Sequence, residues 1–481
     1  MLTRTLALGC AALLAIAGST QGQAPRLNPP SGKLEVSSAS DQAKSEFWLG
    51  FDDWQNFTYS AAQKHFERAA SLDPNFGLAR AFAAAAPAIN GAPVANAELD
   101  RGIADAARAS TAEGLLALAW REKAFGRNAA ASSLFRAAMD LMPNEPRIAS
   151  EYVWSLAATD MKAAAEAGKA ARSKFQTAGV ISPALAYVFT QVGDSAAGLA
   201  EAQRYTQLSP TQPVSFVTYG DYLQQLSRYD DAETQYRRSL AFAPKHGDGT
   251  SDGVVALASL LARRGKAAEA RQVVADAFQR APSIQDSLAY LNILGGASLY
   301  ASDIPAAMSA FETASRLSGR TSKGMATFGP NIALALTNAA FGDRKSVSRY
   351  LSPIRAIEPG DSLAMAWAKA DVYAYAGQSD STFKYADMMV RSSPTDANVA
   401  RAAHFMRGQV YLTNRQCAKA LGEFRQSDST LIEVQSGSAD CEMQAGNRAA
   451  ALRYRDLALR HDVNFYDAGE IRARMRMSQL R

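Results

Sequence analysis

The feature that most limits how this chain can fold is a set of spacings that recurs along it. In one stretch a small residue, Gly220, is followed at fixed distances by Ala232, Tyr236, Ser239 and Pro244. Small residues let two helices cross closely, a large residue fills the space between them, and proline ends the second helix because its ring blocks continuation. The spacing therefore predicts a pair of packed helices.

The same offsets recur elsewhere, with small substitutions. The matching sets are Gly50, Ala62, Phe66, Ala69 and Pro74; Ala119, Ala131, Phe135, Ala138 and Pro143; Ala258, Ala270, Val274, Ala277 and Pro282; Gly295, Ala307, Phe311 and Ala314; and Gly408, Ala420, Phe424 and Ser427. A chain of 481 residues exceeds the roughly 250–300 residues at which one core stops growing. The repeated offsets predict that helix pairs stack in a row and bury their apolar faces on their neighbours.

Glycine also recurs between the helical stretches, where a left-handed residue ends a helix at little cost. These turn glycines are Gly126, Gly193, Gly265, Gly342, Gly377 and Gly446.

Offsets of this kind are the signature of the tetratricopeptide repeat, and the chain resembles that family over nearly all of its mature length. The resemblance implies an all-α, right-handed superhelical solenoid of about eleven or twelve helix pairs. We expect an N-terminal part of the array over 45–321 and a C-terminal part over 322–463. The repeat register is ambiguous in three stretches, which are 75–111 with Pro87 and Pro93, 147–171 and 322–359.

The first residues have the order of a secretory signal, with Arg4, an apolar run over 6–17 and then small residues. The run is shorter than the ~20 apolar residues that span a bilayer. We expect a signal peptide over 1–24, cleaved after Ala24 or Ser19, and a periplasmic or secreted protein without a transmembrane segment. Lipidation of Cys10 is the weaker alternative, because almost nothing apolar precedes it. Residues 25–44 are rich in Pro, Ser and Gly and predict a flexible lead-in.

The net charge of +5 is mild for this length, and a nucleic-acid-binding protein would show a concentrated basic stripe. We therefore expect no nucleic-acid partner. Basic residues gather only in the last segment, 464–481, where Ile471 and Met475 share one helical face and arginines take the others. This segment predicts a basic helix that caps the final repeat, with a functional basic patch as the alternative.

No arrangement of residues predicts catalysis or a cofactor. The four histidines do not pair at helical spacing, and a metal site needs three or four convergent ligands. The chain has no phosphate-binding loop and no nucleophile elbow. We expect no enzyme activity, no metal and no cofactor. The alternative is a small-ligand receptor, or an uncharacterised enzyme, with a pocket inside the solenoid.

Two cysteines remain once the signal is removed, and an even number in an oxidising compartment favours a disulfide. In the repeat framework Cys417 begins the second helix of one pair, and Cys441 lies near the end of the next helix. Successive helices run antiparallel, so these two ends meet. We expect a Cys417–Cys441 disulfide, with two buried thiols as the alternative.

Members of the tetratricopeptide-repeat family usually line their concave side with the first helix of each pair. The Lys and Asn set that some members use to grip a terminal carboxylate is missing here. Mapping the inner positions onto this chain predicts an apolar and aromatic groove, formed by Phe47, Phe51, Trp120, Tyr187, Asp221, Trp367, Asp371, Phe405 and Gln409. Aromatic side chains are favoured anchors for partners. We therefore expect a scaffold that binds protein or peptide segments, although many of these residues are equally able to pack against neighbouring helices.

Overall fold

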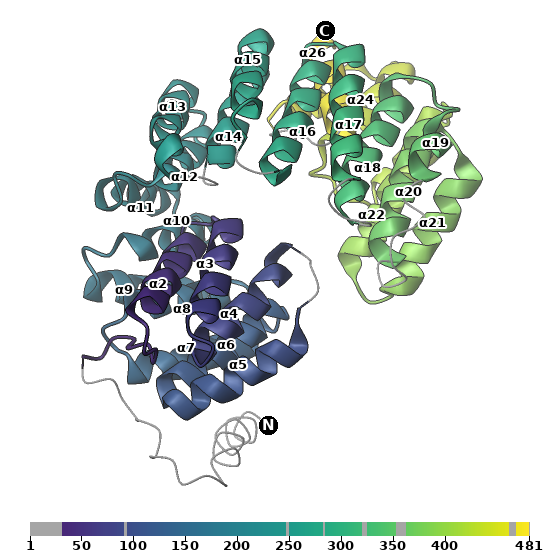
Figure 1. Ribbon diagram of the computed structural model, residues 1–481. Coiled ribbons are helices and arrows are strands. Elements are labelled where there is room, and N and C mark those ends of the chain that lie inside the picture. The colour runs from purple at the N-terminus through teal and green to yellow at the C-terminus, as the bar shows by residue number, and fades with distance from the viewer. Residues whose placement is uncertain are drawn as a thin grey trace. The chain divides into compact units, whose positions relative to one another are not determined.

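The computed structural model describes residues 31–90, 94–246, 250–281, 284–319, 325–352, 362–460 and 468–480. Within these ranges every regular element is a helix (Figure 1). The predicted signal peptide, Cys10 and the start of the lead-in lie outside the described residues, as do Pro93 and Pro282, residues 322–324 and 353–359 of the third ambiguous stretch, and residues 464–467 of the predicted capping segment.

In the part of the chain that the structure describes, the helices follow one another in twelve sequential pairs, within the eleven or twelve expected. The first six pairs are α2 (Asp41–Gln55) with α3 (Tyr59–Leu72), α4 (Gly77–Ala85) with α5 (Asn96–Ala109), α6 (Thr111–Ala124) with α7 (Asn128–Leu141), α8 (Pro146–Ala157) with α9 (Met161–Lys174), α10 (Ser182–Gln191) with α11 (Ser195–Leu208), and α12 (Pro213–Gln225) with α13 (Tyr229–His246). The other six are α14 (Thr250–Arg263) with α15 (Ala267–Phe278), α16 (Ile284–Tyr300) with α17 (Ile304–Ser318), α18 (Met325–Phe341) with α19 (Val347–Leu351), α20 (Ser362–Ala376) with α21 (Ser379–Ser392), α22 (Ala397–Thr413) with α23 (Cys417–Phe424), and α24 (Ile432–Gln444) with α25 (Arg448–Ala458). A last helix, α26, covers Ala468–Gln479.

These pairs form two compact units, one ending at Gly253 and the other beginning at Val254. The division falls near the start of α14, not at the expected boundary between 321 and 322. We call them the N-terminal unit and the C-terminal unit.

The recurring offsets describe the contact between the two helices of a pair. The small residues are buried, and so are the large residues Phe66, Phe135, Tyr236, Phe311 and Phe424. Where the first position is glycine, the ring sixteen residues later lies directly on it. At Gly50 an added Cβ would sit 2.8 Å from two Phe66 ring carbons, closer than real Cβ atoms come. Gly220, Gly295 and Gly408 have the same relation to Tyr236, Phe311 and Phe424. Glycine at this position therefore makes room for a large ring.

Proline acts differently from expectation in two places. Helix α13 continues to His246, so the prediction that it ends at Pro244 was wrong. Pro87 lies in a 3₁₀ helix, η1 (Ala86–Asn90), which follows α4 directly. The missing N–H of proline is tolerated there. The first ambiguous stretch is thus still a helix pair, with a shortened first helix.

Nine of the described turns between paired helices use a left-handed residue, as predicted, but glycine is not always that residue. Gly126, Gly193, Gly265, Gly377 and Gly446 have positive φ, whereas Gly342 does not. In four other pairs a residue with a side chain takes this conformation. These residues are Phe57, Ser227, Ser302 and Arg415. Left-handed backbone is unfavourable for a bulky residue. The positive φ of Phe57, in the turn between α2 and α3, therefore needs a structural reason.

Residues 31–40, expected to belong to a flexible lead-in, are held against the first pairs. The Ser37 N–H donates to Glu113 Oε1 at 2.7 Å, and the Asn144 N–H donates to the Gly32 carbonyl at 2.7 Å. Ser38 Oγ donates to Asp73 Oδ2 at 2.5 Å, and α2 begins at Asp41. The prediction of flexibility failed here because polar composition says nothing about backbone partners supplied by other helices.

The last helix does more than cap the final pair. Helix α26 contacts α24 and α25 of that pair, and it also contacts α16 and α18. Figure 1 shows its label beside α16 and α24. The predicted polar-faced cap is therefore corrected: α26 lies inside the C-terminal unit, against the first helices of several pairs. Ile471 is buried as expected, but Met477, rather than Met475, is the buried methionine.

Cys417 and Cys441 form a disulfide between the start of α23 and the end of α24, the pairing expected from the antiparallel order. Their Cα atoms are 5.2 Å apart, within the usual range for a disulfide.

Candidate functional site: an aromatic track in the N-terminal unit

The turn between α2 and α3, residues 56–58, is held inside the N-terminal unit by pairs that are distant in sequence. Tyr205 Oη of α11 donates to Asn56 Oδ1 at 2.7 Å. Gln55 Nε2 donates to the Arg147 carbonyl of α8 at 3.0 Å. The first pair is thereby joined to the fourth and fifth, so the side chains of this turn face α8 and α11 and not solvent alone.

Six aromatic rings form a continuous series through this interior, and we call them the aromatic track. Successive ring centres are 4.3 Å apart from Trp120 to Trp54, 4.8 Å from Trp54 to Tyr59, 6.2 Å from Tyr59 to Phe57, 6.0 Å from Phe57 to Trp154 and 5.3 Å from Trp154 to Tyr187. Most of these contacts are edge-on or tilted, as aromatic pairs prefer. The left-handed turn at Phe57 places its ring between Tyr59 and Trp154, which gives this unfavourable conformation a structural reason.

The track runs from a buried end to an exposed end. Trp120 is 2% exposed and stacks on Phe82 with ring centres 3.9 Å apart. Phe57, Tyr59 and Trp154 are half-buried, and Tyr187 is 36% exposed.

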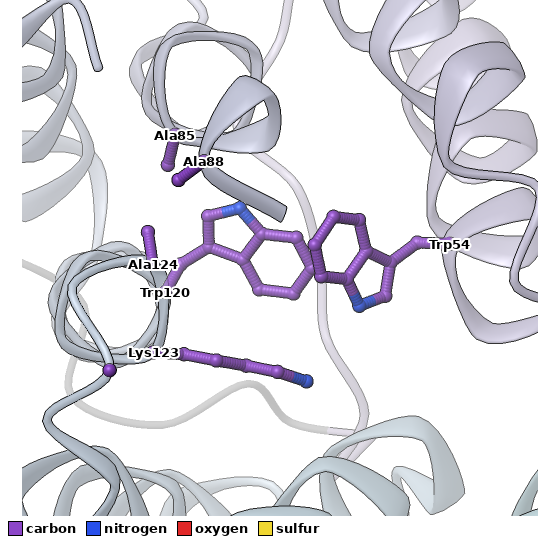
Figure 2. A pocket seen from close by; sticks show the side chains of 7 residues that line it. Trp54, Ala85, Ala88, Trp120, Lys123 and Ala124 are labelled. Carbon is purple, nitrogen blue, oxygen red and sulfur yellow. The ribbon is translucent and has the colours of Figure 1, made fainter. Parts of the chain in front are cut away.

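A cavity of about 200 Å³ opens at the buried end. Figure 2 shows the indoles of Trp54 and Trp120 pointing toward each other from opposite sides, with the Lys123 side chain extended along them. Its lining is mainly apolar and consists of Trp54, Ala85, Ala88, Trp120, Lys123, Ala124 and Gly126. Ala85 and Ala88 leave the space open because their side chains are short.

One cation lies at the cavity, and its charge is balanced by a carboxylate. Lys123 Nζ is 5.5 Å from the Trp54 ring centre and 5.8 Å from that of Trp120, distances at which a cation is attracted to an aromatic face. The same ammonium forms an ion pair with the buried Glu151. Burial raises the pKa of the neighbouring Tyr59, and the negative charge of Glu151 raises it further. The site is therefore apolar and aromatic, without a free positive charge.

Several residues predicted to line the groove lie in the core instead. Phe47, Phe51 and Phe405 are buried. Phe47 and Phe51 belong to an aromatic cluster beneath the track, in which Phe47 also contacts Phe66, Phe76 and Phe82. These residues stabilise the helix pairs and offer no surface to a partner.

The other predicted residues have different surroundings. Tyr187 lies at the exposed end of the track, and in the C-terminal unit Trp367 is 41% exposed. Asp221 accepts a hydrogen bond from Tyr236 Oη at 2.8 Å and so anchors the large residue of its pair. Asp371 is half-buried, and Gln409 is buried beside α26.

The prediction missed Trp54 and Lys123, and a simple signal would have found them. Both lie four residues after the small residue of their first helix, Gly50 and Ala119. Residues four apart share a helical face. The equivalent residues of the C-terminal unit, Leu299 and Leu412, also face inward, where they lie close to α26.

The histidines that the structure describes in side-chain detail join the helices of a pair. His65 Nδ1 lies 2.6 Å from Glu46 Oε2, and His404 Nδ1 lies 2.7 Å from Glu423 Oε2. Across the described ranges, no three or more His, Cys, Asp or Glu side chains are grouped to hold a metal ion. In the same ranges no helix combines the length and apolar character needed to cross a membrane.

Comparison with known proteins finds similarity only among solved structures. No protein-family model and no curated protein matches the sequence. A thermophilic tetratricopeptide-repeat protein of Thermus thermophilus, TTC0263, is 21% identical over 38% of this chain and 98% of its own, with a TM-score of 0.32. PilF of Pseudomonas aeruginosa is 16% identical over 45% of this chain and 93% of its own, with a TM-score of 0.34. A human IFIT1 dimer with m7Gppp-AAAA is 14% identical over 88% of this chain and 91% of its own, with a TM-score of 0.40.

The assignment therefore rests on the chain's own geometry. Within each unit the helices pair in sequence, neighbouring pairs stack on one another, and the small and large residues at the repeated offsets are buried together between the helices. With these features the described part of the chain has the all-α solenoid fold of twelve sequential helix pairs that its repeated offsets predict.

Proposed function

We propose that this protein is an exported scaffold whose N-terminal unit binds a segment of a partner protein along the aromatic track. The observation that carries the proposal is the continuity of the track from the exposed ring of Tyr187 to the cavity between Trp54 and Trp120. An extended segment laid along these rings places one apolar or aromatic side chain in the cavity. Buried aromatic side chains are frequent energetic centres of protein interfaces.

The size of the cavity favours a single side chain over a small-molecule ligand. Pockets for drug-sized ligands measure about 300–1,000 Å³, whereas this cavity measures about 200 Å³. The lining offers one ionisable group, Lys123, which is already paired with Glu151. We therefore propose a binding role and not catalysis.

The charges beside the track favour a protein segment over a nucleic acid. Binding of nucleic acid depends on cations that neutralise phosphates. Lys123 is paired with Glu151, and Arg147 Nη2 lies 2.7 Å from Asp52 Oδ1. These cations would have to leave their carboxylates before they contacted a phosphate.

Export is part of the proposal, supported by the signal-like start of the sequence and by the Cys417–Cys441 disulfide. Disulfides persist mainly in oxidising compartments. The mass of the mature protein tests this, because cleavage after Ala24 or Ser19 removes a defined peptide. A full-length chain recovered from the cytoplasm would contradict export.

A displayed peptide library, selected on the full protein, tests the binding role. We expect the enriched peptides to share an apolar or aromatic anchor and to bind Tyr187→Ala and Trp154→Ala at least ten-fold more weakly than the wild type. Tyr229→Ala is the matched control, because Tyr229 is 40% exposed in the same unit and lies outside the track. Equal binding by all three variants would refute the track as the site. Selective binding of single-stranded RNA that is lost in Tyr187→Ala would replace the protein partner with a nucleic acid.

A further inference from the structure

The position of α26 is unusual for the terminal helix of a stacked array. A helix that only shields the last pair contacts α24 and α25, but α26 also contacts α16 and α18, which belong to pairs far earlier in the chain. Tyr375 of α20 and Gln409 of α22 lie beside it as well. The helix is thus surrounded by first helices of the C-terminal unit, as a bound helical ligand is surrounded by its receptor.

The apolar side chains of α26 are buried on more than one side of the helix. Ile471, Ala473 and Met477 are nearly inaccessible to solvent. They belong to a single hydrophobic cluster with Leu299 of α16 and Leu334 of α18. The helices around α26 therefore contribute apolar side chains to this contact, and we call these helices the receptor.

Two arginines on α26, one turn apart, meet an acidic side of the receptor. Arg472 and Arg476 line a small cavity together with Glu433 and Asp440 of α24. Arg476 Nη2 lies 2.5 Å from Asp440 Oδ2. Burial raises the pKa of Asp440 and lowers that of Arg472. The Arg476 side chain is 44% exposed and that of Asp440 is 13% exposed, so the pair is only partly buried. Removing the arginines would leave the Asp440 carboxylate without a compensating charge, and this loss destabilises the docked α26 by more than the net worth of the pair.

Helix α20 carries one large ring that is buried beside α26 and another that is exposed. Trp367 and Tyr375 are eight residues apart on α20, a spacing that places both on the same broad side of a helix. Tyr375 is buried beside α26, whereas Trp367 is 41% exposed.

We propose that the interior of the C-terminal unit is a binding site for an amphipathic helix with two arginines one turn apart, and that α26 occupies this site until such a helix from a partner protein displaces it. The partner helix presents apolar residues to Leu299 and Leu334, and its arginine pair to Glu433 and Asp440. This site is separate from the aromatic track and does not depend on it.

The test uses the full-length protein and a fluorescent peptide with the sequence of residues 468–480 as the probe. The wild type should bind the peptide weakly, because its own α26 competes. Arg472→Ala with Arg476→Ala weakens α26 and leaves the receptor unchanged, so peptide affinity should rise at least ten-fold. Adding Asp440→Ala should remove that gain. Gln479→Ala is the control, since Gln479 is exposed on the same helix, and it should behave as the wild type.

Two results would overturn the proposal. One is that the double variant keeps its helical circular dichroism but binds the peptide no better than the wild type. The other is a dimer that exchanges α26 between copies, seen by light scattering, which would assign the helix to self-assembly. If the double variant fails to fold, hydrogen exchange of the wild type serves instead: excess peptide should accelerate exchange of residues 468–480, and unchanged exchange would refute displacement. Tyr187→Ala should alter none of these results, which keeps this test independent of the aromatic track.

Discussion

The two units fill their interiors in different ways. In the N-terminal unit the array covers its own inner face, because the turn between α2 and α3 reaches α8 and α11 and its aromatic neighbours continue the track. In the C-terminal unit a separate helix, α26, lies on the first helices α16, α18 and α24. The inner residues are Trp54 and Lys123 in one unit and Leu299 and Leu412 in the other, all four residues after the small position. One repeat position thus builds a fixed aromatic surface in one unit and a receptor for a helix in the other.

The largest expected effect is a loss of stability in the N-terminal unit alone, caused by a cavity in its core. Phe66→Ala removes a fully buried ring that contacts Phe47 and Phe82. It should lower the free energy of unfolding of the N-terminal unit by about 3–5 kcal/mol, the usual cost of such a cavity. Calorimetry and residue-resolved hydrogen exchange would measure it.

Phe125→Ala is the control for Phe66→Ala, because Phe125 is an exposed phenylalanine of the same unit, and it should change stability by less than about 0.5 kcal/mol. The C-terminal unit should be unaffected by either variant. If Phe66→Ala destabilises both units equally, they fold as one body and the comparison between them fails.

A pH effect is expected in the N-terminal unit. Burial raises the pKa of Glu113 from 4.5 to about 7, although its Oε1 accepts the Ser37 N–H. The folded state therefore holds a proton that the unfolded state releases, and stability falls as pH rises from about 4.5 to about 7. The loss is on the order of 3 kcal/mol.

Denaturant unfolding at pH 5 and pH 8 measures the difference. Glu113→Gln cannot ionise, so its stability should change much less across the same interval. A wild type that becomes more stable as pH rises, with the variant lacking that rise, would show that Glu113 is ionised and stabilised in the folded state.

Reduction of the disulfide should act on the other unit. The Cys417–Cys441 bond closes a loop with a sequence separation of 24 residues, and breaking it should cost about 3 kcal/mol or less. Dithiothreitol should lower the melting temperature of the C-terminal unit and leave that of the N-terminal unit unchanged. Cys417→Ser with Cys441→Ser should be insensitive to the reductant. An equal response to the reductant in this double variant would mean that the effect does not come from the disulfide.

The sequence was most informative about contacts within a pair. Gly220 and Tyr236 lie in adjacent helices, and so do Cys417 and Cys441. Repeat spacing alone therefore brings the members of each pair together. It was least informative about contacts between distant pairs. The Tyr205 hydrogen bond to Asn56 and the packing of α26 on α16 and α18 depend on how far each pair turns relative to the last. Small rotations set that curvature, and no local pattern encodes them.

The same limit explains why the groove residues were partly misassigned. Phe47, Phe51 and Phe405 occupy first helices, as an inner surface requires, but one turn decides whether a side chain points at the neighbouring helix or into the interior. Trp54, four residues after Gly50, points into the interior. The choice between these two faces needed the packing of the neighbouring pairs.

Native-state hydrogen exchange of the oxidised full-length protein is the most direct test of the difference between the units. It asks whether the interior of the N-terminal unit opens only on unfolding, and whether α26 can leave the interior of the C-terminal unit by itself. The amides of residues 56–58 are all hydrogen-bonded, so their exchange can be followed beside that of α26. The account predicts that α26 exchanges by a local opening while α16, α18 and α24 stay protected, and that residues 56–58 exchange only when the N-terminal unit unfolds. Exchange of α26 together with α24, or early exchange at residues 56–58, would contradict it.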